Sequence, residues 1–418
     1  MKIDCTLNCT PRLEMSVPVP NPLSAISLFS GCGGDTLGMG RAGYTVGAFN
    51  EFRQIAINTH MENFPHSVLL QGNSPDITKV PDATFEPYKG KTDLVFAGFP
   101  CQGFSRAGNR KAADPRNQMY TQFVRAVKLT EPKFFIGENV PGLVSMKSGP
   151  KEDDPPVLSI IIAAFKQIGY DLTYKVLEAT DYGVPQKRKR LLLVGWRTAV
   201  VPTFDTASFW TAVHTFGLTK KMPKLRSFVT NSMECAHKIP AGNVPLDFAN
   251  YALPVAQDAE PTGEPHPFIV LKADASNVEY DGETHKSLLT CSKRGSPIHS
   301  EIIDLDAPSK TIICTYDHQP RLLVGLRKPD GTAYARCLLP DELKQIQGFP
   351  ADFKVLGNKK EQIVQIGNAV PPPLIEAVAT VLRGLASAIA PVPVPSPVSV
   401  PVVATVKKRV FKVVAGSI

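Results

Sequence analysis

Short apolar runs recur through the first 200 residues, and each one ends at glycine, proline or a polar residue. Such runs are typical of strands that are buried on both faces of a parallel sheet. The runs predict strands at 25–28, 45–49, 94–97, 133–137, 172–176 and 191–194. Apolar residues at helical spacing predict helices at 34–42, 53–63, 118–129 and around 158–165. The alternation of strand and helix predicts an α/β fold with a doubly wound sheet.

The pattern changes after Trp196, where prolines multiply and helical spacing fades until about Pro308. We predict a second, smaller domain rich in loops and short strands there, because the strand-helix alternation stops at its edge. Regular spacing returns near Pro340, which suits the first position of a helix. The predicted division is an irregular arm at 1–22, a first domain at 23–197, a second domain at 198–335, a connecting segment at 336–364, a terminal helix at 365–388 and a basic, Pro/Val-rich tail at 389–418 that we expect to be disordered.

Composition narrows the class of protein without identifying it. The net charge of +8 and the pI near 9.0 favour a polyanionic partner. The eight cysteines include no C-x-x-C pair, which argues against a zinc site and a disulfide framework. No signal peptide and no run of about 18 apolar residues is visible. We therefore expect an intracellular protein with no metal site and no membrane partner.

Cys101 follows the apolar run 94–97 after a break at Gly98 and Pro100. This places the thiol at the carboxyl end of a buried strand, where open α/β sheets have their active sites. A cysteine there can act as a nucleophile if its thiolate is stabilised. The alternative is that Cys101 only packs in the interior, as most isolated cysteines do. Its neighbours must decide between the two.

A glycine-rich turn, Ser30-Gly31-Cys32-Gly33-Gly34, follows the first predicted strand, and Glu51 follows the second. Glycines at a helix start let backbone N–H groups approach a ligand, and an acidic residue about 20 positions later binds a ribose diol in nucleotide-type folds. The turn can also be a plain tight turn. Glu51 can also be a carboxylate that stabilises the start of the next helix.

Other polar groups lie near the ends of later strands. Glu138-Asn139 follows the strand at 133–137, and four cations, Lys187 to Arg190, lead into the strand at 191–194. A run of cations is more often a solvated surface than a site. The polar segment 106–116 can be a phosphate-contacting lid or an ordinary solvated loop.

Six ordered motifs give the chain a resemblance to the DNA (cytosine-5) methyltransferase family of prokaryotic and viral type. Together they are specific, although each alone is weak. They span about residues 24–385 and are Phe29-Ser30-Gly31-Cys32-Gly33-Gly34, Gly98-Phe99-Pro100-Cys101-Gln102, Glu138-Asn139-Val140, Gln186-Lys187-Arg188-Lys189-Arg190, Gln347-Gly348-Phe349-Pro350 and Gly367-Asn368-Ala369-Val370-Pro371. The resemblance implies the Rossmann-like fold of S-adenosylmethionine-dependent methyltransferases, with 365–388 completing the first, catalytic domain.

The resemblance also implies catalytic roles. Cys101 would add to carbon 6 of cytosine, and Glu138 would donate a proton at N3. Arg190 would contact the base's O2, and Arg188 would contact the backbone and the catalytic loop. Asn139 would orient the turn that carries the cysteine.

The implied cofactor is S-adenosyl-L-methionine, with S-adenosyl-L-homocysteine as product. By resemblance, Phe29 stacks on the adenine and Glu51 binds the ribose hydroxyls. The expected cofactor-binding residues are Phe29, Gly31, Gly33, Gly34, Glu51, Phe52, Asp76, Ile77, Pro100, Met119, Asn368 and Ala369.

The implied substrate is a specific sequence in double-stranded DNA, from which the target base is flipped out beneath the lid at 102–116. The second domain would read base edges in the major groove. The expected substrate-binding residues are Gln102, Ser105, Arg106, Arg116 and Gln186. We expect a monomer on DNA, with a cognate restriction endonuclease as a candidate partner, in the cytoplasm or nucleoid of a prokaryote or in the host cell or nucleus if the chain is viral.

Three alternatives remain at this point. One branch of the family methylates cytosine in tRNA, although the long second domain argues against that substrate. A second alternative is a catalytically silent, sequence-specific DNA-binding regulator. Cys101 and Glu138 argue against it, because a protein that only binds DNA needs no nucleophile. A nucleotide-binding dehydrogenase is the weakest alternative, because it leaves the Pro100-Cys101 loop and the arginine cluster unexplained.

Overall fold

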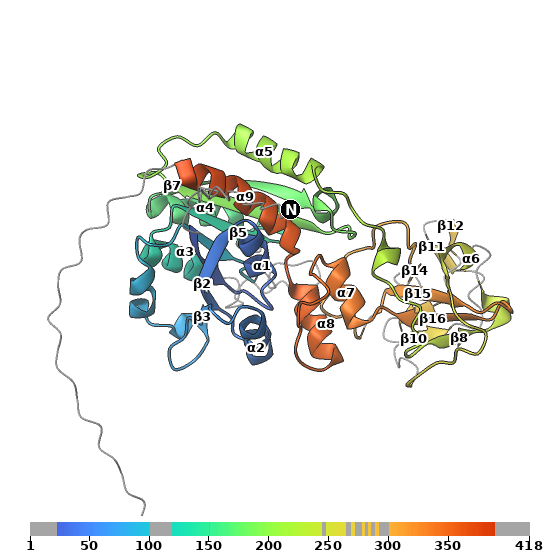
Figure 1. Cartoon of the computed structure of the whole chain (residues 1–418). Helices are drawn as coiled ribbons and strands as arrows, with labels where there is room; N and C mark the ends of the chain where they lie inside the picture. Colours follow the sequence, from blue (N-terminus) through green and yellow to red (C-terminus); the bar gives the residue numbers. More distant parts are fainter. Residues whose placement is uncertain are drawn as a thin grey trace, which may run out of the picture.

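The computed structural model describes residues 23–100, 119–149, 151–244, 248–264, 269–271, 278–280, 283–285, 289–291, 301–318 and 320–388. Figure 1 shows a large lobe and a small lobe, each built on its own sheet. Helices α7 (Pro340–Ile346) and α8 (Lys359–Asn368) lie between the two lobes.

The large lobe contains a seven-stranded sheet in the order β3-β2-β1-β4-β5-β7-β6. The first five strands are parallel, and β7 runs antiparallel to both β5 and β6. The strands are β1 (Leu23–Leu28), β2 (Tyr44–Asn50), β3 (Val68–Leu69), β4 (Leu94–Ala97), β5 (Phe134–Asn139), β6 (Tyr170–Glu178) and β7 (Lys189–Arg197). All six predicted strands are confirmed, and the short edge strand β3 was not predicted.

The chain reverses its direction across the sheet between β1 and β4. It runs from β1 outward to β2 and β3, and then returns to β4 on the other side of β1. The connections after β1 and β4 therefore diverge, which opens a crevice at the carboxyl ends of these two strands.

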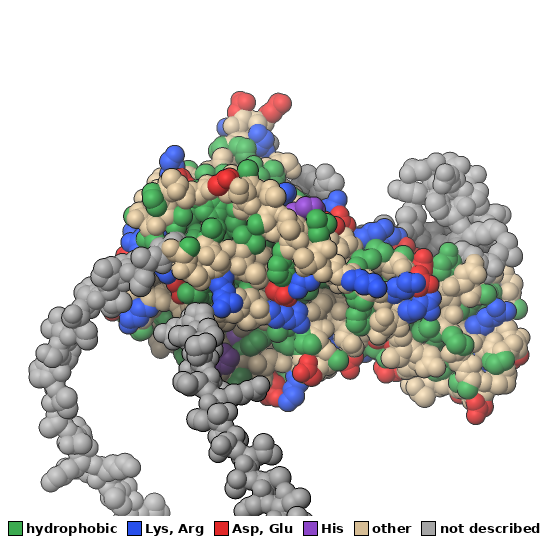
Figure 2. Space-filling view, turned by 45° about the horizontal axis from the view of Figure 1, so that its top comes forward, with side chains coloured by type: hydrophobic (Ala, Val, Ile, Leu, Met, Phe, Trp, Pro, Cys, Tyr) green, Lys and Arg blue, Asp and Glu red, His purple; other side chains and the backbone are tan. Residues whose placement is uncertain are grey.

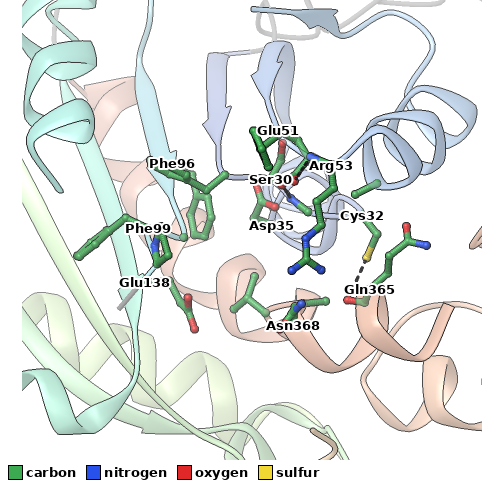
Figure 3. Close-up of a pocket in the computed structure, with 18 of the residues that line it drawn as sticks. Ser30, Cys32, Asp35, Glu51, Arg53, Phe96, Phe99, Glu138, Gln365 and Asn368 are labelled. Carbon is green, nitrogen blue, oxygen red and sulfur yellow. Dashed lines mark hydrogen bonds between the residues drawn. The ribbon is translucent and has the colours of Figure 1, made fainter. Parts of the chain in front are cut away.

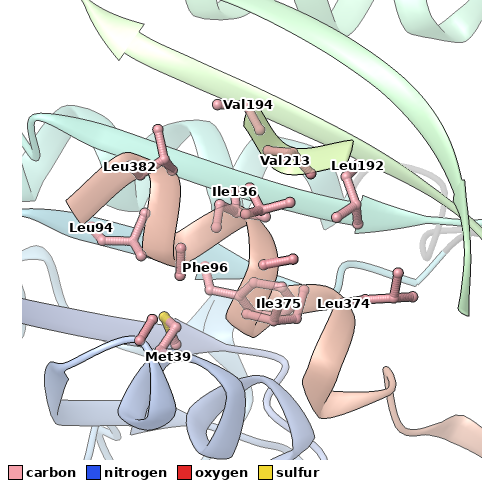
Figure 4. Close-up of a cluster of buried hydrophobic side chains, with 14 of the residues drawn as sticks. Met39, Leu94, Phe96, Ile136, Leu192, Val194, Val213, Leu374, Ile375 and Leu382 are labelled. Carbon is pink, nitrogen blue, oxygen red and sulfur yellow. The ribbon is translucent and has the colours of Figure 1, made fainter. Parts of the chain in front are cut away.

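Helices cover both faces of this sheet. On β4, Leu94 and Phe96 pack in the cluster that contains residues of α1, α5 and α9, whereas Val95 and Ala97 pack with residues of α3 and α4. Figure 4 shows the first of these faces, where Ile375 and Leu382 of α9 lie over the sheet. The helices of this lobe are α1 (Gly34–Arg41), α2 (Gln54–Asn63), α3 (Met119–Thr130), α4 (Val157–Gln167), α5 (Thr206–Leu218) and α9 (Pro372–Ala388). Burial on both faces explains why the strands are continuously apolar.

Helix α5 lies within residues 196–308, where we predicted a domain rich in loops and short strands. Phe209, Trp210 and Val213 of α5 belong to the apolar cluster of the large lobe. Asp205 accepts hydrogen bonds from the backbone N–H groups of Ala207 and Ser208 and so caps the helix. The helix therefore packs with the first sheet, although it falls in the range that we assigned to the second domain.

The small lobe has a five-stranded sheet in the order β14-β15-β16-β8, with β9 paired to β15. Leu343 and Ile346 of α7 and Ile363 and Ile366 of α8 share the apolar cluster of this lobe. The sheet strands are β8 (His237–Ile239), β9 (Leu253–Pro254), β14 (Glu301–Ile302), β15 (Leu322–Arg327) and β16 (Ala333–Cys337). Two further strand pairs and a short helix complete the described part: β10 (Ile269–Leu271) with β13 (Leu289–Cys291), β11 (Val278–Tyr280) with β12 (Glu283–His285), and α6 (Phe248–Tyr251).

One helical stretch in the described part, Lys359–Ala388, is long and apolar enough to cross a membrane. Its most apolar window is 61% buried within the protein. It comprises α8 and α9, which pack in the clusters of the two lobes. This burial is the behaviour of core helices in a globular protein.

Candidate active site

A cavity of about 600 Å³ lies at the carboxyl ends of β1, β2, β4 and β5. Phe29 follows β1, Glu51 follows β2 and Gly98 follows β4, while Glu138 lies at the end of β5. The cavity therefore occupies the crevice created by the reversal between β1 and β4. Its volume lies in the range of small-molecule binding sites.

Glu138 and Arg190 form an ion pair inside this cavity. Arg190 Nε lies 2.7 Å from Glu138 Oε1, and both side chains are 15% exposed. The sheet creates the contact because β5 and β7 are antiparallel, with Glu138 paired to Leu192 and Asn139 paired to Leu191. The carboxylate is thus held in a fixed direction, with Figure 3 showing it beside Phe99.

Asn139 connects β5 to the turn after β4. Its side-chain amide donates a hydrogen bond of 3.1 Å to the carbonyl oxygen of Phe99, and its side-chain oxygen accepts one from the Val140 N–H. Asn139 is buried, so these bonds are shielded from water. They fix the backbone two residues before Cys101.

Glu51 is anchored by the backbone on two sides. Its Oε2 accepts a hydrogen bond of 2.9 Å from the Gly31 N–H, and its Oε1 accepts one of 2.8 Å from the Arg53 N–H. Each carboxylate oxygen keeps further acceptor capacity for a ligand. The next residue, Phe52, lines the same cavity and is 67% exposed.

The glycine-rich turn has two different structural roles. Gly31 has a φ of 53° and lines the cavity, and no atom lies within 4 Å of a Cβ built on it. We predicted Gly33 and Gly34 as cofactor-binding residues, but they do not line the cavity. A Cβ on Gly33 would lie 2.5 Å from Phe64 Cε2, and a Cβ on Gly34 would lie 2.4 Å from the Val370 oxygen. These two glycines allow close packing behind the cavity.

The remaining predicted cofactor residues all line the cavity. They come from five separate parts of the chain and are Phe29, Asp76, Ile77, Pro100, Met119, Asn368 and Ala369. Asp76 accepts hydrogen bonds from the Thr78 hydroxyl and N–H, and these bonds lower the pKa of its carboxyl. Asp76 therefore stays ionised at neutral pH.

Arg188 also lines the cavity, but its side chain is buried among backbone groups. It donates hydrogen bonds to the carbonyl oxygens of Ile312, Gly367 and Ala369 at 2.8 to 3.0 Å. This contradicts the idea that the whole run of cations is solvated. Arg188 fixes the backbone on both sides of Asn368.

Gln186 requires a correction. We predicted a substrate contact, but the side chain is fully buried and does not line the cavity. Its amide nitrogen donates to Gln347, and its oxygen accepts from the Ile312 N–H. Because the amide nitrogen and the amide oxygen both form hydrogen bonds inside the protein, Gln186 has a structural role.

Five predicted site residues lie outside the described residues: Cys101, Gln102, Ser105, Arg106 and Arg116. The last described residue before Cys101 is Pro100, which lines the cavity. A Cβ built on Gly98 would lie 3.6 Å from Glu138 Oε2, so the segment that leads to Cys101 passes next to Glu138. No group of three metal-binding side chains occurs in the part of the chain that the structure describes.

Two charged residues of the cavity, Asp35 and Arg53, were not predicted from the sequence. Asp35 is buried, accepts a hydrogen bond from the Ser27 hydroxyl, and has its pKa raised to about 7 by burial. Both residues stand at a helix start just after a strand that borders the cavity. That shared position is the signal that could have found them.

Comparisons with known proteins identify the family of this chain. The model of the family described as C-5 cytosine-specific DNA methylase matches residues 23–383. The chain belongs to this family. Its activity is methyl transfer to carbon 5 of cytosine in DNA, which confirms the resemblance and disfavours the RNA alternative.

Curated relatives and solved structures extend the match over most of the chain. It is 34% identical to the Type II methyltransferase M1.HphI of Haemophilus parahaemolyticus, over 85% of this chain and 86% of that protein. It is 29% identical to the Type II methyltransferase M.NgoPII of Neisseria gonorrhoeae, over 87% of this chain and 96% of that protein. The S. pombe Dnmt2 methyltransferase shares the fold, with a TM-score of 0.57 and 15% sequence identity. The match covers 87% of this chain and 99% of that chain.

Proposed function

We propose that Cys101, Glu138 and Arg190 carry out the methylation of a cytosine that is flipped out of duplex DNA. The observation that supports this assignment is the Glu138–Arg190 ion pair next to the fixed turn at Phe99. An ion pair at this position offers a carboxyl group and a guanidinium to the polar edge of one pyrimidine. Cytosine within a duplex is inaccessible, so the base must leave the stack.

The chemistry explains why these groups are needed. Carbon 5 of cytosine is a weak nucleophile until a thiolate adds to carbon 6 and makes the ring electron-rich. We assign this addition to the Cys101 Sγ. Glu138 takes up a proton when the base binds, donates it at N3 as the bond forms and recovers it when the adduct breaks down, while Arg190 keeps the carboxyl oriented and contacts O2. After methylation, a base removes the carbon 5 proton, the electrons of that bond re-form the ring double bond, and Sγ leaves carbon 6.

S-adenosyl-L-methionine, the methyl donor that the family implies, would supply an electrophilic methyl group. The cavity fits it in volume and in chemistry. Glu51 presents a fixed carboxylate for a ribose diol, while Phe29 and Phe52 offer aromatic faces for the adenine. Asn368 and Pro100 line the side of the cavity where we place the methionyl group.

We further propose that the small lobe recognises the target sequence in the major groove, so that the predicted second domain keeps this role. Figure 2 shows Lys and Arg side chains along the junction of the two lobes on the face in view. Such a distribution favours contact with phosphates. We expect the protein to act as a monomer on intracellular DNA, with a cognate restriction endonuclease as partner.

The test is methyl transfer from a labelled donor to duplex DNA, with tRNA as the competing acceptor. We expect labelling of DNA, no labelling by the Cys101→Ser variant, and covalent trapping of the wild type by 5-fluorocytosine-containing DNA. Labelling that persists in Cys101→Ser would overturn the mechanism. DNA binding without labelling or trapping would support a silent regulator, and mapping 5-methylcytosine in a methylation-free host would identify the recognition sequence.

A further inference from the structure

Three arginines line the cavity, and two of them are already engaged. Arg188 is bonded to three backbone carbonyl oxygens, and Arg190 is paired with Glu138. The guanidinium of Arg53 has no hydrogen bond and no carboxylate within 4 Å in the part of the chain that the structure describes. Because an arginine remains charged at all physiological pH values, the cavity holds at this point a cation with no ion-pair partner among the described residues.

The backbone of Arg53 is fixed even though its side chain is exposed. Its N–H donates to Glu51 Oε1, and the residue caps α2 with an extended backbone. Glu51 in turn is bonded to the Gly31 N–H. The guanidinium is therefore carried by the same rigid unit that presents the carboxylate proposed for the ribose.

Figure 3 shows the direction of the Arg53 side chain. It extends from beside Glu51 across the cavity toward Asn368, on the side away from Glu138. Both Arg53 and Asn368 line the cavity, and Arg188 holds the backbone on either side of Asn368. The cation thus lies between the proposed ribose contact and the proposed methionyl wall, away from the ion pair assigned to the base.

We propose that Arg53 binds the α-carboxylate of the methionyl group of S-adenosyl-L-methionine. This inference rests on the proposed function and adds a cofactor-binding residue to it. The carboxylate is the one anionic group of that molecule, and a guanidinium binds it through paired, charge-assisted hydrogen bonds. A DNA phosphate is the competing anion, and the position of Arg53 on the far side from Glu138 favours the carboxylate.

The test compares the affinities of two ligands that differ by this carboxylate. S-adenosyl-L-homocysteine and its decarboxylated analogue are titrated calorimetrically into the wild type, Arg53→Ala, Arg53→Lys and the remote control Arg327→Ala. We expect Arg53→Ala to bind S-adenosyl-L-homocysteine about 10-fold more weakly, as is typical when a hydrogen bond to a charged group is lost. The decarboxylated analogue should bind Arg53→Ala and the wild type equally, and Arg53→Lys should regain part of the loss.

Equal weakening of both ligands by Arg53→Ala would overturn the inference, because it would indicate a structural role. An unchanged affinity for S-adenosyl-L-homocysteine with a raised KM for DNA would also overturn it and assign Arg53 to a phosphate. Each of these results leaves the proposed function intact. Failure of the wild type to bind S-adenosyl-L-homocysteine would instead overturn the assignment of the cofactor cavity itself.

Discussion

Arg336 of β16 and Glu342 of α7 form an ion pair of 2.7 Å, and their side chains are only 0% and 2% exposed. Arg336 also donates to the backbone oxygens of Ser232, Thr230 and Cys337. Glu342 accepts from the Leu339 N–H and so supplies a cap at the start of α7, where Leu339 itself has no side-chain acceptor. The pair thus joins the sheet of the small lobe to the helix that leads back to the large lobe.

Breaking this pair should strongly destabilise the fold. The Glu342→Gln substitution leaves a buried, uncompensated guanidinium, so we expect a loss of about 3 to 5 kcal/mol in the free energy of unfolding, measured with urea. The control Glu301→Gln removes the exposed pair with Lys310 and should cost less than about 1 kcal/mol. Equal effects of the two substitutions would contradict the role assigned to the buried pair.

Replacing Glu138 by Gln should abolish most of the activity while the fold remains. The amide cannot donate the proton that we assign to Glu138, so we expect turnover to fall by about 100-fold or more. The affinity for S-adenosyl-L-homocysteine should stay within about two-fold of the wild type. The matched control Glu178→Gln removes the partner of Lys189 on the neighbouring strand and should remain active. Full activity of Glu138→Gln would exclude the proposed proton donor.

Asp35 should make stability depend on pH. Burial raises the pKa of its carboxyl from 3.8 to about 7, so the folded state holds this proton more tightly than the unfolded state does. Stability is therefore lost as the pH rises from about 4 to about 7. Asp35→Asn has no carboxyl group to titrate, so it does not lose this stability. The free energy of unfolding of Asp35→Asn minus that of the wild type should therefore increase by up to about 4 kcal/mol between these two pH values, given 1.36 kcal/mol per pKa unit.

Thermal unfolding of the two proteins at several pH values measures this difference. His60 acts in the opposite direction, because burial lowers its pKa from 6.5 to about 3, so its contribution is lost as the pH falls. That contribution is common to both proteins and cancels in the comparison. The exposed control Asp258→Asn should keep the wild-type pH dependence. Parallel curves for Asp35→Asn and the wild type would refute the effect.

Two glycines of α1 should respond in opposite ways to alanine. A Cβ on Gly34 would lie 2.4 Å from the Val370 oxygen, whereas nothing lies within 4 Å of a Cβ on Gly40. Gly34→Ala should destabilise the protein by about 1 to 3 kcal/mol and weaken cofactor binding, because it displaces the backbone next to Asn368. Gly40→Ala should stabilise it by up to about 1 kcal/mol. Chemical unfolding and S-adenosyl-L-homocysteine titration measure both effects, and similar results for the two variants would rule out this packing.

The sequence by itself determined the class of fold and the family. Continuous apolar runs identified six strands of the first sheet because those strands are buried on both faces. The order of six motifs identified the family, since chemistry requires particular residue types near strand ends. Glu51, Glu138 and Asn368 were recognised in this way, and all three line one cavity.

Only the tertiary structure decided which of these residues meet and which are buried. Arg188, Gln186 and Arg190 belong to one polar run, yet the first two are buried and Arg190 pairs with Glu138 in the cavity. Helix α5 joined the large lobe for the same kind of reason, because its apolar face fits the first sheet. Asp35 follows β1 and Arg53 follows β2, and both residues line the cavity because these two strands are neighbours in the sheet. Strand order and burial arise from contacts between residues distant in sequence, and local patterns do not contain that information.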